Sequence, residues 1–157
     1  MPVRSAGRTD QLSGSRQRSA GSSPRTLVAL RVTSVLTLAC LAFQFVTAGV
    51  LISRPGASAD IHGGGAIVLH VLAGLTAVAA VVHWRKRHTG RWPSVIAALV
   101  FLFSFVQAAI GDSGVMWLHV PGALVLTVGA VWLTAWSFGR GTNAQDSDQA
   151  RTDGRSL

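Results

Sequence analysis

Four long apolar runs separate polar segments along the chain, and their length predicts the fold. They cover residues 32–52, 65–84, 94–110 and 115–138, and none of them contains Asp, Glu, Lys or Arg. A helix needs about 20 apolar residues to cross the hydrocarbon core of a bilayer, with a range of about 17–25. A backbone in hydrocarbon must satisfy its own hydrogen bonds, which favours a helix in every run. We therefore predict an all-α integral membrane protein, an up-down bundle of four transmembrane helices within residues 32–138.

The two ends of the chain have a different composition. Residues 1–31 are dominated by Arg, Ser and Gly, and residues 139–157 mix Arg with Asp. Such segments bury too little apolar surface to offset chain entropy, so we predict a disordered basic N-terminal tail and a disordered C-terminal tail. The first apolar run is longer than the core of a secretory signal, about 7–15 residues, so we expect a retained helix.

Composition narrows the class further. The 157 residues are 49% hydrophobic and only 13% charged, whereas about 25% is usual in soluble domains. A water-soluble enzyme is therefore excluded, and the single cysteine, Cys40, rules out an intrachain disulfide. No glutamate or glycine-rich phosphate loop is present, and no acid lies inside an apolar run. We assign no catalytic residues and lean against an enzyme, and we rank a small-solute permease last among the candidate functions.

The distribution of basic residues predicts the orientation. With four spans, both tails and the loop around residues 85–91 lie on one side, which holds thirteen of the fourteen Lys and Arg residues. The positive-inside rule then places both termini in the cytoplasm, and we expect the plasma membrane of a bacterium. The tryptophans fit two interfacial belts, with Trp84, Trp92, Trp132 and Trp136 near the inner face and Trp117 near the outer one.

An internal repeat relates the two halves. FQFVTAGV at 43–50 aligns with FSFVQAAI at 103–110, an offset of sixty, and HGGGAIVL at 62–69 aligns with HVPGALVL at 119–126, an offset of fifty-seven. The first two and last two helices therefore look like copies of one hairpin in the same orientation, related by an axis along the membrane normal. The repeat places His62 and His119 at matching depth.

The histidines are the candidates for chemistry. His62 and His119 each begin a helix near the outer face, and two facing imidazoles could ligate a haem iron axially. Small residues follow both histidines and would let a flat cofactor approach the backbone. His70 is a weaker ligand candidate, because it lies about 12 Å deeper than His62 at about 1.5 Å per residue and aligns with Thr127.

These histidines also have structural interpretations. His62 and His119 could be polar residues at helix starts, hydrogen-bonded to water or loop carbonyls, and His70 could hydrogen-bond a neighbouring helix. We expect His83 and His88, beside the basic loop, to be interfacial.

Four uncharged polar residues lie on the first and third helices. We expect them to hydrogen-bond between helices, and the functional alternative is contact with a quinone or a haem edge. They are Gln44, Thr47, Ser104 and Gln107.

The same motifs support a resemblance over roughly residues 30–139. FQFVTAG, then His62 and His70, then FVQAA and LHVPG resemble a family of small four-helix bacterial membrane proteins of unknown function. The outline also resembles one half of haem A synthase, whose four-helix half holds haem between two histidines near the starts of its second and fourth helices. That resemblance implies His62 and His119 as the axial pair, and it implies a homodimer if the eight-helix arrangement is to be rebuilt.

The favoured function is binding of one b-type haem between the second and fourth helices for electron transfer, with His62 and His119 as iron ligands. The alternative is a cofactor-free membrane scaffold or accessory subunit, and the third is the permease. Expected partners are the lipid bilayer and a second copy or a redox partner in the membrane, and no nucleic acid.

Overall fold

The computed structural model describes residues 25–87 and 90–153, and every regular element in these two stretches is an α-helix. The helices are α1 (Arg25–Ser53), α2 (Asp60–Arg87), α3 (Trp92–Asp112) and α4 (Met116–Asp153). Each contains a stretch long and apolar enough to cross a membrane. The predicted all-helical, four-helix membrane fold is confirmed.

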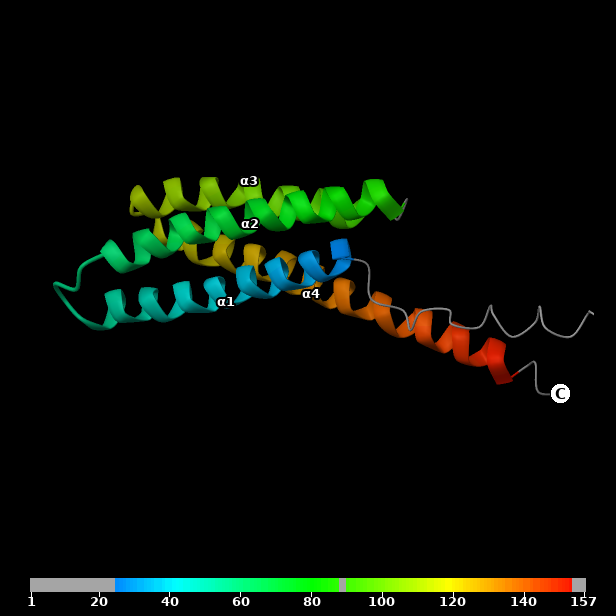
Figure 1. The fold of residues 1–157 in the computed structure, drawn as a ribbon. Coiled ribbons are helices and arrows are strands. Elements are labelled where there is room, and N and C mark those ends of the chain that lie inside the picture. The colour runs from blue at the N-terminus through cyan, green and yellow to red at the C-terminus, as the bar shows by residue number, and fades with distance from the viewer. Residues whose placement is uncertain (1–24, 88–89, 154–157) are drawn as a thin grey trace, which may run out of the picture.

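The four helices run up and down beside one another (Figure 1). Each helix contacts two others, so the four are arranged as the corners of a square. Helix α1 packs against α2 and α4, and α3 packs against the same two helices. In the described part of the chain, α2 and α4 therefore lie on one diagonal and α1 and α3 on the other. The α1–α2 and α3–α4 loops lie at the same end of the bundle (Figure 1). Below, this is called the loop end.

Buried positions recur at spacings of three and four residues, as in a coiled coil. In α3 they include Ala97, Val100, Ser104 and Gln107, which is the spacing of a left-handed helical bundle. Large apolar side chains instead cover the outside, among them Ile52, Ile67 and Val128. The interior combines apolar side chains such as Leu30 and Leu133 with buried hydroxyl and amide groups. An apolar exterior of this kind suits lipid as the surrounding solvent.

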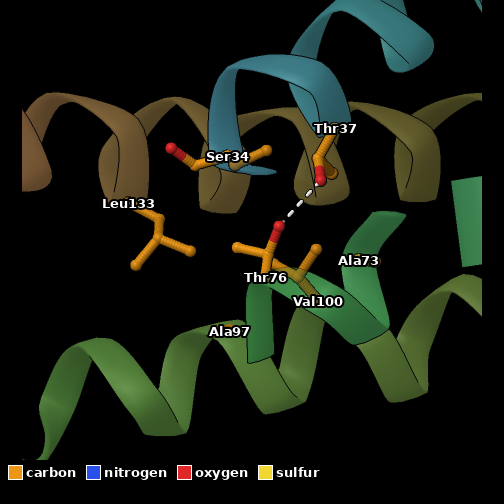
Figure 2. Close-up of a pocket in the computed structure, with 8 residues that line it drawn as sticks. Ser34, Thr37, Ala73, Thr76, Ala97, Val100 and Leu133 are labelled. Carbon is orange, nitrogen blue, oxygen red and sulfur yellow. Dashed lines mark hydrogen bonds between the residues drawn. The ribbon is translucent and has the colours of Figure 1, made fainter. Parts of the chain in front are cut away.

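A small cavity in the middle of the bundle is lined mostly by apolar side chains, with three hydroxyl-bearing residues, Ser34, Thr37 and Thr76, at its wall (Figure 2). Its volume is about 10 Å³, room for about one water molecule. The Oγ1 atoms of Thr37 and Thr76 join α1 to α2 at 3.0 Å across this cavity. The Ser34 hydroxyl beside them donates to its own helix, to the Arg31 carbonyl at 3.1 Å. This cavity is therefore part of the packing and has no room for a solute.

Two helices continue beyond the predicted apolar segments into polar sequence, α1 at its start and α4 at its end. Helix α1 begins at Arg25 rather than at residue 32, and its added turn buries Leu27 and Leu30. Helix α4 continues to Asp153, through much of the expected disordered segment 139–157. No proline follows Pro121 to stop it. The rest of the predicted N-terminal tail, 1–24, lies outside the described residues.

Helix α2 also starts earlier than predicted, at Asp60 rather than at residue 65. Three consecutive glycines, 63–65, are unfavourable in a helix, so the sequence gives no strong signal that a helix begins before them. In the structure, the Gly63 amide donates to the Ala59 carbonyl at 2.8 Å. The Asp60 amide donates to the Ser58 hydroxyl at 3.1 Å, and the Asp60 carboxylate lies in the first turn, where the helix dipole favours it.

Candidate functional site

Two imidazoles meet near the loop end of the bundle. His62 lies in the first turn of α2 and His119 in the first turn of α4. Although these helices are diagonal to one another, the ring centroids are 6.5 Å apart, with an angle of 69° between the ring planes. The structure therefore brings together the two histidines that the sequence analysis paired.

Hydrogen bonds fix which nitrogen of His62 carries its proton. His62 Nδ1 lies 2.8 Å from the Thr47 hydroxyl of α1. That hydroxyl has one proton, which it donates to the Gln44 carbonyl at 3.0 Å. With that proton on the carbonyl, Thr47 accepts from His62, so Nδ1–H is the donor and Nε2 keeps its lone pair. Nε2 is the nitrogen of His62 that is free to bind an electrophile.

His119 is held in the same tautomer by a different partner. Its Nδ1 lies 3.0 Å from the Gln107 carbonyl of α3, which can only accept. Nδ1 is therefore the donor, and Nε2 again keeps its lone pair. The ring also lies close to the backbone of Gly111, where an added Cβ would be 2.9 Å from His119 Cε1. A side chain at this position would push the ring away, so the glycine helps to set its place.

The two rings are close enough to hold one metal between them. A metal–imidazole bond is about 2 Å long, so two imidazoles that shared a metal would have ring centroids roughly 6 Å apart. The observed value is 6.5 Å. Metal-binding histidines commonly donate their other N–H to a carbonyl or a similar acceptor, which both of these Nδ1 groups do.

Next to the imidazoles, two glutamine side chains fill notches left by glycines. Gly65 and Gly122 each lie three residues after a histidine of the pair. A Cβ added at Gly65 would overlap the Gln44 amide, and one added at Gly122 would overlap the Gln107 amide. Gln44 Nε2 donates to the His62 carbonyl at 3.1 Å. Gln44 Oε1 and both amide atoms of Gln107 are buried and have no hydrogen-bond partner.

His70, the weaker ligand candidate, lies outside this pair. It is two turns further along α2, and its ring packs on Phe105 of α3 with centroids 4.1 Å apart. Its Nδ1 is buried and has no hydrogen-bond partner. The structure therefore places His70 against an aromatic ring, and no second imidazole packs on it among residues 25–87 and 90–153.

His83 lies inside the bundle, near the end of α2 beside the basic loop. Only 5% of its surface is exposed, and it lies between α1 and α4 at the end opposite the loop end. Thr26 Oγ1 is 3.2 Å from its Nδ1, and the Trp136 ring meets it edge to face at 6.3 Å. The extension of α1 back to Arg25 supplies Thr26 as this partner. His88 lies outside the described residues.

Sequence reasoning missed several contacts of this site. Gly111 gave no signal, because its role depends on how the α3–α4 loop folds back onto His119. The predicted hydrogen bonds between helices are present for Gln44 and Thr47, which both bond His62. In the described part of the chain they are absent for the other two residues, because the Ser104 hydroxyl bonds its own helix and the Gln107 amide has no partner. The spacing histidine-x-x-glycine, present at both histidines, was the available signal for the notches.

Comparison with known proteins finds no matching family model, curated protein or solved structure.

Proposed function

We propose that this multi-pass membrane protein binds one b-type haem between α2 and α4, with His62 and His119 as axial ligands, and acts in electron transfer. The observation that carries the proposal is the pair of imidazoles with centroids 6.5 Å apart. Both rings have Nδ1 engaged, so both Nε2 atoms are left to bind. One-electron exchange at iron is the chemistry that the haem supplies when bound.

The donor set favours haem over a bare metal ion. Zinc takes at least three protein ligands even in catalytic sites. In the part of the chain that the structure describes, no group of three or more His, Cys, Asp or Glu could hold a metal. A porphyrin brings four equatorial nitrogens of its own, so two imidazoles complete the coordination of its iron.

The chain's own residues would hold and orient the ligand nitrogens. Thr47 and the Gln107 carbonyl fix the tautomer of each ring, and Gly111 allows the His119 ring its close approach. Both imidazoles are only partly exposed.

The internal repeat and the resemblance to one half of haem A synthase are two sequence arguments that support this proposal. Two hairpins in parallel orientation account for histidines at equal depth on the second and fourth helices. A homodimer or a separate redox partner in the membrane would supply the second redox centre. The charge distribution supports a bacterial plasma membrane with both termini in the cytoplasm.

The alternative, a cofactor-free scaffold, has one observation in its favour. Both imidazoles hydrogen-bond a neighbouring helix, His62 to α1 and His119 to α3. Such bonds stabilise helix packing in membranes by about 0.6 kcal/mol each without any ligand.

Purification in mild detergent from haem-replete cells separates the two functions. The proposal expects a Soret band that shifts on reduction with dithionite, with one haem per chain. A colourless protein that also takes up no added hemin would support the scaffold.

Thr47→Val tests the hydrogen bond that orients His62. Valine keeps the shape of threonine but removes the acceptor for Nδ1–H, so we expect the affinity for hemin to fall about 10- to 100-fold. The measurement is a hemin titration of the apoprotein followed at the Soret maximum. Thr127→Val is the matched control, because the Thr127 hydroxyl bonds only the Ala123 carbonyl of its own helix. Equal losses in both variants would contradict the role of Thr47.

A further inference from the structure

The Gln107 side chain is buried, and the residues around it do not satisfy the hydrogen-bonding groups of its amide. Only 3% of its surface is exposed, and neither Oε1 nor Nε2 has a hydrogen-bond partner. A buried amide without partners is unfavourable, because the protein does not replace the hydrogen bonds it made to water. The amide fits at all only because Gly122 has no Cβ.

Gln44 repeats this arrangement on the other side of the bundle. Its amide occupies the notch at Gly65, and its Oε1 is also without a partner. Its Nε2 does have one, the His62 carbonyl at 3.1 Å. Gln44 is therefore held in its notch by one bond, whereas no side-chain hydrogen bond holds Gln107.

The two amides come from the helices toward which a flat ligand would extend. A macrocycle held between His62 of α2 and His119 of α4 would reach toward the other diagonal, α1 and α3. Gln44 and Gln107 are on these two helices. The glycines are three residues beyond the histidines, about 4.5 Å along the helix axis, which is within the span of a porphyrin from its iron.

We propose that Gln107, assisted by Gln44, sets the affinity of the site by occupying the ligand's place. The amides fill the notches at Gly122 and Gly65, and a haem held between the two histidines would have to displace them. This inference rests on the proposed haem function. A protein whose binding-competent form is only partly populated binds its ligand more weakly by that fraction. Shortening the glutamine should therefore strengthen binding.

Hemin titration of apoprotein variants in mild detergent tests this proposal. We expect Gln107→Ala to bind hemin about 10-fold more tightly than the wild type, and to bind it faster in stopped-flow mixing. Gln44→Ala should show the same change to a smaller extent. Ser104→Ala is the matched control, because Ser104 is buried one turn away on α3 and its hydroxyl donates to the Phe101 carbonyl at 2.6 Å.

Gln107→Met guards against a misfolded alanine variant. Methionine fills the notch without orphaned polar atoms, so this variant should fold well and bind hemin no more tightly than the wild type. Unchanged or weaker binding by a folded Gln107→Ala would overturn the proposal and identify the amide as a ligand contact or as packing.

The proposed function fails in a different way. If wild-type protein takes up no hemin, or if His119→Ala takes it up equally well, the haem site and this inference fail together. If the wild type binds through the histidines and Gln107→Ala gains nothing, only this inference fails.

Discussion

Replacing either His62 or His119 with alanine is expected to abolish the six-coordinate haem spectrum and to lower hemin affinity by at least about 100-fold. Losing only a hydrogen bond behind a metal-bound histidine costs about 10–100-fold, and loss of the ligand itself removes a metal bond as well. The two rings are 6.5 Å apart, and no other imidazole packs on either ring within the described residues. Absorption spectra and hemin titrations of the purified variants measure both effects.

His70→Ala is the control for this pair. His70 is also a helix α2 histidine with a buried Nδ1, but its ring packs on Phe105. The His70→Ala variant should keep the wild-type spectrum. In a separate experiment, imidazole added to His119→Ala should fill the space left by the missing ring and restore a six-coordinate spectrum. Loss of the Soret band in His70→Ala alone, with both other variants intact, would place the site elsewhere on α2.

The second large effect is on stability. Gly122→Ala is expected to lower the free energy of unfolding by about 1–3 kcal/mol, because its Cβ overlaps the Gln107 amide and a packed interior does not accommodate the extra methyl group. Gly64→Ala is the matched control on α2, where an added Cβ meets nothing within 4 Å. That change should be neutral or stabilising by up to about 1 kcal/mol, since alanine favours helix over glycine. Thermal unfolding in mild detergent, followed by tryptophan fluorescence, compares the two.

A double variant identifies the cause of that loss. In Gln107→Ala with Gly122→Ala the overlapping amide is gone, so most of the lost stability should return, with a coupling energy in the range of about 0.5–3 kcal/mol that contacting residues show. Additive losses in the double variant would mean that the Gly122 methyl group meets something other than Gln107.

The fold could be predicted from the sequence because lipid leaves few alternatives. An uncharged run of about 20 residues must be helical in hydrocarbon, and four such runs with short connections form a bundle of neighbours. The ends were less predictable, because they lie in polar sequence and the extension of α1 is supported by packing contacts such as the burial of Leu27 and Leu30. Arg25 and Asp153 fall in polar sequence, yet the structure extends α1 and α4 that far.

The pairing of the histidines could be predicted because the position of a residue along a membrane-spanning helix indicates its depth in the membrane. His62 and His119 occupy the same place after an outer loop in the two aligned halves, and their rings meet in the structure. The rotation of each helix about its own axis could not be predicted from sequence position. The partners Thr47 and Gln107, the notches at Gly65 and Gly122 and the contact at Gly111 all depend on which face of each helix turns inward.

Titration of the apoprotein with hemin, read against the His62→Ala, His119→Ala double variant, tests the central claim most directly. We expect the wild-type Soret band to rise to a sharp end point at one hemin per chain with the spectrum of six-coordinate, low-spin iron, and the double variant to show neither. An identical titration curve for both proteins, or no saturable binding by the wild type, would contradict the claim that these two imidazoles hold a haem.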